Sequence, residues 1–180
     1  MTAKIPTTTM TIRSSTIVNP VCFWLVEVMY VVYRKSISYN DIIMKIFIIC
    51  SKAFYGTIPP IKEALEKAGH EITLPNSYDD PDAESKYREL GAEEHAIWKA
   101  GMIKHSEDVI NGIDAVLVLN FEKNSQQNYI GGATFLEMYD AFRLGKKLYI
   151  YNDVPDGMLK DEIIGFAPIL IHQDLSLLTD

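Results

Sequence analysis

The distribution of apolar positions predicts a sheet whose strands alternate with helices. Short runs rich in β-branched residues alternate with longer segments whose apolar residues recur at helical spacing. The runs that predict strands are residues 45–50, 71–74, 114–120, 146–151 and 168–171. Strands that alternate with helices form parallel sheets through right-handed crossovers, and the helices cover both faces. The sequence therefore predicts a flavodoxin-like or Rossmann-like α/β fold with a five-stranded, mostly parallel sheet.

Glycines mark the limits of the two longest helical segments. The segment 83–112 is polar and contains Gly91 and Gly101, so we expect a break near one of them. A second helix begins at the glycine pair 131–132 and continues to Gly145.

Residues 1–43 differ in pattern from the rest of the chain. The apolar stretch 17–33 contains an acid, Glu27, and is shorter than the roughly 20 apolar residues of a membrane span. Met44 stands directly before the first predicted strand. We therefore expect residues 44–180 to be the domain and residues 1–43 an extension, either a mis-assigned start or a disordered segment. A membrane-anchoring signal and a helix that packs on the domain are the alternatives.

The charge distribution, the cysteines and the missing motifs argue against several classes of ligand. The net charge is −7 and bases are interspersed with acids, whereas a nucleic-acid-binding surface needs a basic stripe. Cys22 and Cys50 do not have the spacing of metal ligands, and a thiol at the end of an apolar strand is typical of a reducing, cytoplasmic compartment. The sequence contains neither a dinucleotide-binding glycine motif nor a phosphate-loop lysine motif. We expect no metal and no cofactor.

Residues 128–138 combine the features of a ligand-binding corner. They follow the predicted strand 114–120 and a polar loop, and their glycines, Gly131 and Gly132, open a helix. Glycines allow close approach of a ligand to the backbone, and the N–H groups of a first helical turn favour an anion. Glu137 lies just over one turn into this helix, among small or apolar neighbours. An acid stabilised by the helix dipole is the alternative interpretation.

Other polar residues follow the predicted strands at the same edge. In parallel sheets ligands bind beyond the carboxyl ends of the strands. The candidates there are Ser51, Tyr55, Asn120, the loop 121–130, Gly131, Gly132 and Glu137, and Asp108 could reach this edge from the preceding helix. The alternatives are structural: Ser51 caps a turn, Tyr55 is a half-buried loop aromatic, and Asp108 is one acid on a solvated helix.

Nearly all of residues 44–180 resembles the nucleoside 2-deoxyribosyltransferase family, whose superfamily includes 2′-deoxynucleoside 5′-phosphate N-hydrolases. The matching segments are residues 48–51, 107–118 and 131–147, with the Asn-Tyr-Ile-Gly-Gly sequence of Asn128 to Gly132 and the segments 161–163 and 168–169. The likeness is greatest to uncharacterised members that share the sequence Asn-Tyr-Ile-Gly-Gly. Residues 1–43 are not part of it.

The resemblance implies a role for several residues. Glu137 matches the family's nucleophile, Asp108 matches an acid that contacts the base or assists its departure, and residues 51–55 match a loop that contacts the sugar or 5′ group. The transferases carry acids where this chain has Gly131 and Gly132, which favours hydrolysis over base exchange. A carboxylate nucleophile would form a covalent glycosyl intermediate that water or a second base resolves.

The expected partner is a small nucleoside or nucleotide, without nucleic acid or membrane. Family members assemble as dimers or larger oligomers, so the resemblance also implies a homo-oligomer. Fold does not fix function, however, and a non-catalytic nucleotide-binding or sensor domain on the same scaffold is the alternative.

Overall fold

The described chain consists of alternating strands and helices. The computed structural model describes residues 43–179, so the extension expected for residues 1–43 lies almost wholly outside the described residues. In chain order the elements are β1 (Lys45–Cys50), η1 (Lys52–Thr57), α2 (Ile58–Lys67), β2 (Glu71–Thr73), α3 (Ala83–Leu90), α4 (Ala92–Asn111), β3 (Ala115–Leu119), α5 (Gly132–Arg143), β4 (Lys147–Ile150), α6 (Lys160–Gly165), β5 (Ile169–Leu170) and η2 (Leu175–Leu177).

The five strands form one sheet in the order β2-β1-β3-β4-β5. Every neighbouring pair is parallel, with Ile48 opposite Leu117 between β1 and β3 and Leu117 opposite Tyr149 between β3 and β4. This order is that of flavodoxin-like folds, in which the chain reverses direction across the sheet after β2. The predicted fold class is confirmed, and the sheet is wholly parallel.

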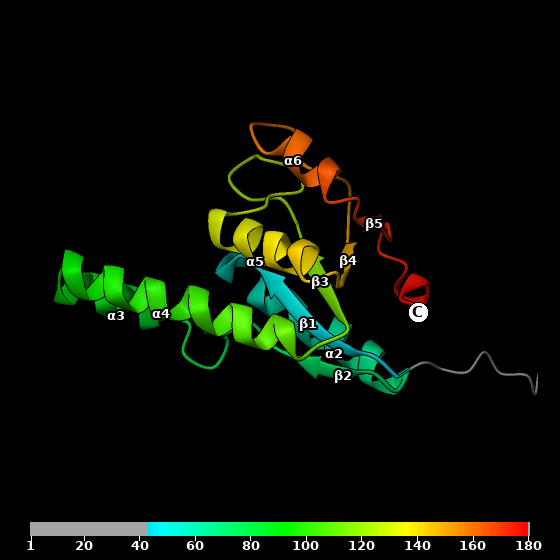
Figure 1. The fold of residues 1–180 in the computed structure, drawn as a ribbon, viewed down its shortest axis with the longest axis horizontal. Helices are drawn as coiled ribbons and strands as arrows, with labels where there is room; N and C mark the ends of the chain where they lie inside the picture. Colours follow the sequence, from blue (N-terminus) through cyan, green and yellow to red (C-terminus); the bar gives the residue numbers. More distant parts are fainter. Residues whose placement is uncertain (1–42, 180) are drawn as a thin grey trace, which may run out of the picture. The chain divides into compact units, whose positions relative to one another are not determined.

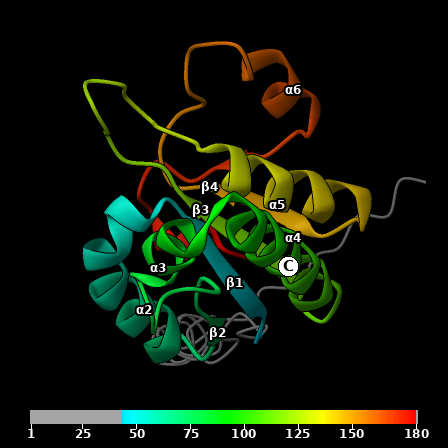
Figure 2. The same cartoon turned by 90° about the vertical axis from the view of Figure 1, so that its left-hand side faces the viewer.

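Alternate residues of each strand enter two separate cores. Ile46 and Ile48 pack with α2 on one face, whereas Phe47 and Ile49 pack with α4, α5 and α6 on the other. Figure 2 shows α4 and α5 next to each other on one side of the strands and α2 on the other. All five residues of β3 are buried, as expected for a central strand covered on both faces. The prediction of helices on both faces is confirmed.

The long polar segment breaks at Gly91 and not at Gly101. Gly91 has φ 146°, a conformation that residues with a side chain rarely adopt, and it separates α3 from α4. Gly101 lies within α4, which packs against both α3 and α5. In Figure 1, α3 and the first half of α4 extend beyond the carboxyl ends of the strands. Within residues 43–179, α4 and the other helices lack the combination of length and apolar character that a membrane span requires.

Candidate active site

A cavity of about 510 Å³ lies at the carboxyl ends of β1 and β3. The turn after β1, the loop after β2, the arm formed by α3 and α4, and the start of α5 all border it. Its lining is Cys50, Ser51, Lys52, Tyr55, Pro75, Asn76, Ser77, Glu84, Trp98, Lys99, Met102, Ile103, Ser106, Lys123, Tyr129, Gly131, Gly132, Ala133, Thr134, Leu136, Glu137 and Asp140. The cavity lies where ligands bind in open parallel sheets, and its volume is typical of small-molecule sites.

Glu137 is the half-buried acid of this cavity. Its Oε1 accepts a hydrogen bond of 2.8 Å from the Ser106 hydroxyl, whose oxygen accepts one of 2.7 Å from the Asn76 side-chain amide. Burial raises the pKa of Glu137 to about 7; Ser106 and Lys99 oppose this rise, and Asp140 adds to it. Near neutral pH this carboxyl therefore exchanges its proton readily and is available in both forms.

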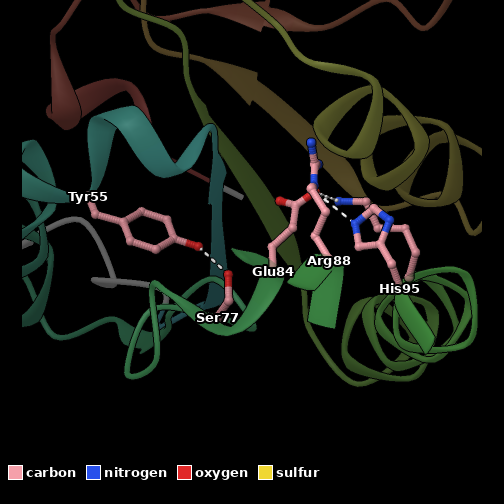
Figure 3. Close-up of polar contacts among 6 residues, drawn as sticks. Tyr55, Ser77, Glu84, Arg88 and His95 are labelled. Atoms are coloured by element: carbon pink, nitrogen blue, oxygen red, sulfur yellow. Dashed lines mark hydrogen bonds and ion pairs between the residues drawn. The ribbon is translucent and has the colours of Figure 1, made fainter. Parts of the chain in front are cut away.

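Cys50 and Tyr55 stand beside Glu137 as neutral groups. Burial, with the nearby charge of Glu137, raises the pKa of the Cys50 thiol to about 12. The Tyr55 hydroxyl lies 2.8 Å from the Ser77 hydroxyl, and the two point toward each other in Figure 3. Burial raises the pKa of Tyr55, although its hydrogen bond to Ser77 acts in the opposite direction. The thiol is thus not a nucleophile here, and Tyr55 offers a hydroxyl rather than a charge.

Glu84 differs from Glu137 in that its surroundings lower its pKa. Its Oε1 lies 3.0 Å from Lys99 Nζ, 3.1 Å from Arg88 and 3.4 Å from His95 Nε2, and Figure 3 shows Arg88 and His95 converging on Glu84. Burial acts to raise its pKa, but the hydrogen bonds from Lys99, His95 and Arg88 together lower it. Glu84 is therefore a fixed negative charge that ties α3 to α4.

Aromatic side chains form much of the cavity wall. Trp98 is stacked against Tyr87 with ring centres 5.6 Å apart, and Lys99 Nζ lies 5.3 Å from the Trp98 ring centre. On the opposite side, Lys123 Nζ lies 4.5 Å from the Tyr129 ring centre and 3.0 Å from the Ser51 hydroxyl. The wall thus combines flat apolar surfaces with cationic groups, a combination that suits a planar ligand with an anionic substituent.

The structure brings five of the predicted site residues together. Ser51, Tyr55, Gly131, Gly132 and Glu137 all line the cavity. Neither glycine has a positive φ, so the backbone conformation alone does not require glycine at either position. A Cβ on Gly131 would lie 3.3 Å from the Tyr129 hydroxyl, whereas one on Gly132 would enter open space. Glycine at the first position leaves room for the Tyr129 side chain, and glycine at the second keeps the start of α5 open.

Asn120 and Asn128 follow β3 as predicted but do not line the cavity. The Asn120 amide is buried and donates to the carbonyl of Asp153 at 2.8 Å, while its Oδ1 accepts from the Asn152 backbone at 3.0 Å. Asn128 has φ 54°, a turn conformation that asparagine tolerates. Both asparagines shape the loops at the ends of β3 and β4 rather than a binding surface.

Asp108 lies at the other end of the sheet. It is exposed and borders a surface hollow with Lys45 and Glu71, which belong to the amino ends of β1 and β2. Residues two positions apart on an α-helix lie on nearly opposite sides of it, so the Asp108 side chain points away from that of Ser106. Within one chain Asp108 is therefore not placed to act with Glu137.

Ser106 and Asn76 are two of the cavity residues that sequence reasoning missed. A signal for Ser106 existed, because Trp98, Met102, Ser106 and Ile110 follow one another at intervals of four along α4 and share a face. Ser106 is 5% exposed, so it belongs to the packed face of the helix. No sequence pattern indicated Asn76, because it lies in the turn after β2, and residue spacing in a turn does not predict where a side chain points.

The part of the chain that the structure describes contains no group of three His, Cys, Asp or Glu side chains arranged to hold a metal ion. Comparisons with protein-family models, with curated proteins and with solved structures find no match for this chain. The family resemblance therefore stays a prediction made from the residues quoted above.

Proposed function

We propose that this protein cleaves the N-glycosidic bond of a nucleoside or of its 5′-monophosphate, with Glu137 as the nucleophile. The observation that carries the proposal is the environment of Glu137, a half-buried carboxyl in a cavity at the carboxyl ends of the strands, with a pKa raised to about 7. Perturbed acids in such cavities are typical of catalytic sites. The sequence resemblance supports the same role.

The walls of the cavity support a nucleoside as the ligand. Trp98, Tyr129 and Leu136 supply apolar surface for a base, and the hydroxyls of Ser51 and Tyr55 are suited to a sugar. Two features favour a 5′-phosphate: α5 begins at Gly132 without a side-chain cap, and the Lys123 ammonium lies beside Ser51.

The reaction follows from a carboxylate facing an anomeric carbon. An oxygen of ionised Glu137 attacks this carbon, the bond from carbon to the base nitrogen breaks, and the electron pair leaves with the base, which takes a proton from solvent. Water then attacks the glycosyl ester to release the sugar and regenerate the carboxylate. A second base in place of water would complete a transfer instead.

The leaving group receives no help from Asp108 in this account, because that residue is outside the cavity. The acids that share the cavity with Glu137 are Glu84 and Asp140, and both contact cations. The lowered pKa of Glu84 keeps it ionised. Glu84 is therefore not a ready proton donor, and the proposal relies on nucleophilic attack rather than on general-acid assistance.

The test is incubation of the full-length chain with a panel of nucleosides, deoxynucleosides and their 5′-monophosphates, with and without a free acceptor base. Chromatography that shows free base without an acceptor identifies a hydrolase, and new nucleoside formed only with an acceptor identifies a transferase. If no compound of the panel reacts while a nucleotide still raises the melting temperature, the protein is the non-catalytic binding module.

A further inference from the structure

A chain of hydrogen bonds connects three separate elements to Glu137. Asn76, in the loop after β2, donates from Nδ2 to the Ser106 hydroxyl of α4 at 2.7 Å. Ser106 in turn donates to Glu137 Oε1 of α5 at 2.8 Å. The linked residues are 30 and 31 positions apart in sequence, so the connection is made only in the folded chain.

This chain has a fixed direction. An amide nitrogen can only donate, so the Ser106 oxygen must accept from Asn76. A hydroxyl has a single hydrogen, and with its oxygen accepting from Asn76 this hydrogen is available for Glu137. Because Ser106 is 5% exposed, bulk water cannot easily offer it another partner. Asn76 therefore keeps Ser106 in the role of donor.

The second oxygen of Glu137 is left available to the cavity. Among residues 43–179, only Ser106 makes a hydrogen bond to the Glu137 carboxyl, and it does so at Oε1. In the same residues no side-chain oxygen or nitrogen is both fully buried and without a partner, so Oε2 must be accessible. One oxygen is thus held while the other faces the space that a substrate would occupy.

We propose that Asn76 and Ser106 are positioning residues for Glu137: the Asn76 amide orients the Ser106 hydroxyl, which holds Oε1 so that Oε2 is presented to the substrate. The proposal rests on the proposed function, since it assigns these residues a role in the action of the nucleophile. It also explains why a polar serine stands on the packed face of α4. A hydrogen bond donated to the ionised carboxyl favours that form over the protonated one.

Other groups also act on Glu137 and must be held constant in a test. Asp140 on the same helix and Lys99 on α4 act on its pKa, while Cys50 at the end of β1 and Tyr55 in η1 are neutral groups that its charge affects. The Ser106 hydroxyl is the one neutral donor among the groups that favour the ionised form, and Lys99 is the one cation. A change at position 76 leaves all of these side chains in place.

The experiment exchanges the donor at position 76 for an acceptor of the same shape. In Asn76→Asp the carboxylate would draw the Ser106 hydrogen toward itself and place a second negative charge near Glu137. Asn111→Asp is the matched control, because Asn111 is an exposed residue at the end of α4 and the variant gains the same charge. The probe is the ¹³C NMR titration of Glu carboxyls in full-length protein, with the Glu137 signal assigned by its absence from Glu137→Gln.

We expect the Glu137 titration midpoint to rise by about one pH unit or more in Asn76→Asp and to stay unchanged in Asn111→Asp. Ser106→Ala should also raise it, and Ser106→Thr, which keeps the hydroxyl, should restore it. If the Asn76 variant does not fold, the pair of Ser106 variants answers the same question. Unchanged midpoints in Asn76→Asp and Ser106→Ala would overturn the proposal.

Turnover provides a second measurement that separates this proposal from the proposed function. We expect kcat at neutral pH to fall about fivefold or more in Asn76→Asp, with KM nearly unchanged and kcat recovered at higher pH. If the wild-type chain has no turnover but its Glu137 midpoint still responds to these variants, the function fails and the positioning role stands. If turnover depends on Glu137 but the midpoints do not move, the positioning role fails alone.

Discussion

The two ends of the parallel sheet present the same kind of side chain in opposite environments. At the carboxyl ends, Glu137 is half-buried in a cavity of about 510 Å³ and accepts a hydrogen bond from Ser106. At the amino ends, Asp108 is exposed and borders a surface hollow with Lys45. Both were candidate catalytic acids from sequence. The comparison shows that burial and a fixed hydrogen-bond partner, rather than residue type, make a carboxyl a candidate for catalysis.

Exchanging each acid for its amide gives the largest expected contrast. Glu137→Gln keeps the shape of the side chain but removes the proposed nucleophile, so we expect a loss of about a thousandfold or more in kcat. Asp108→Asn should stay within about twofold of wild type, since a surface acid has little effect on a site at the other end of the sheet. The measurement is base release from the best substrate of the panel. Equal losses in the two variants would abolish the distinction between the two ends.

The pH dependence of turnover sharpens the contrast next. In the proposed reaction ionised Glu137 is the nucleophile, and burial raises its pKa to about 7, so kcat/KM should fall as the pH drops below 7. Between pH 8 and pH 5 we expect a decrease of about a hundredfold. Asp108→Asn should leave this profile unchanged. A profile that stays flat down to pH 5 would mean that Glu137 is not the group whose ionisation limits the reaction.

The titration of Glu137 should also make the stability of the folded chain depend on pH. The pKa of Glu137 is raised in the folded state from 4.5 to about 7, so the folded chain holds this proton more tightly than the unfolded chain. Folding is therefore favoured at low pH, and this contribution is lost as pH rises from 4.5 through 7.

Glu137→Gln has no such titration, so it should be more stable than wild type at pH 8 by about 2–3 kcal/mol relative to their difference at pH 4.5. Urea unfolding of both proteins at the two pH values measures this difference. A Glu137→Gln curve parallel to wild type would show that the carboxyl is not held in a desolvated environment.

The smallest expected effect separates the two glycines at the start of α5. In Gly131→Ala the new methyl group would meet the Tyr129 hydroxyl at 3.3 Å, so Tyr129 must shift within the cavity wall. In Gly132→Ala the methyl group would enter open space. We expect KM to rise several-fold in the first variant and about half as much or less in the second. If substrate titrations gave a larger rise in KM for Gly132→Ala than for Gly131→Ala, the ligand would occupy the open space at Gly132.

The fold was predictable because its signals are local and repeated. Short β-branched runs such as residues 45–50 alternate with helical segments, and each run is long enough to predict a buried strand. The strand order could not be read from these runs, because register and neighbours depend on contacts between distant segments. Of Gly91 and Gly101, the two glycines inside the segment 83–112, only Gly91 has a positive φ, and it separates α3 from α4.

The candidate site was predictable where a residue directly follows a strand or opens a helix. Ser51 and Gly131 reach the cavity for this reason. Asn120 also follows a strand, but its side chain turns inward to bind the backbone of Asp153. On α4 the error was one of helical direction, since Asp108 and Ser106 are two residues apart and face different ends of the sheet. Charged residues occur all around this helix, so the sequence pattern did not reveal which of its faces is packed.

The most direct test of the central claim is mass spectrometry of the protein quenched in acid during turnover, followed by peptide mapping. If Glu137 is the nucleophile, the peptide that contains it gains the mass of the sugar, or of the sugar phosphate, when a reactive substrate is present. The same peptide of Glu137→Gln stays unmodified and base release stops. Base released at an undiminished rate by Glu137→Gln, or the sugar found on another residue, would contradict the account.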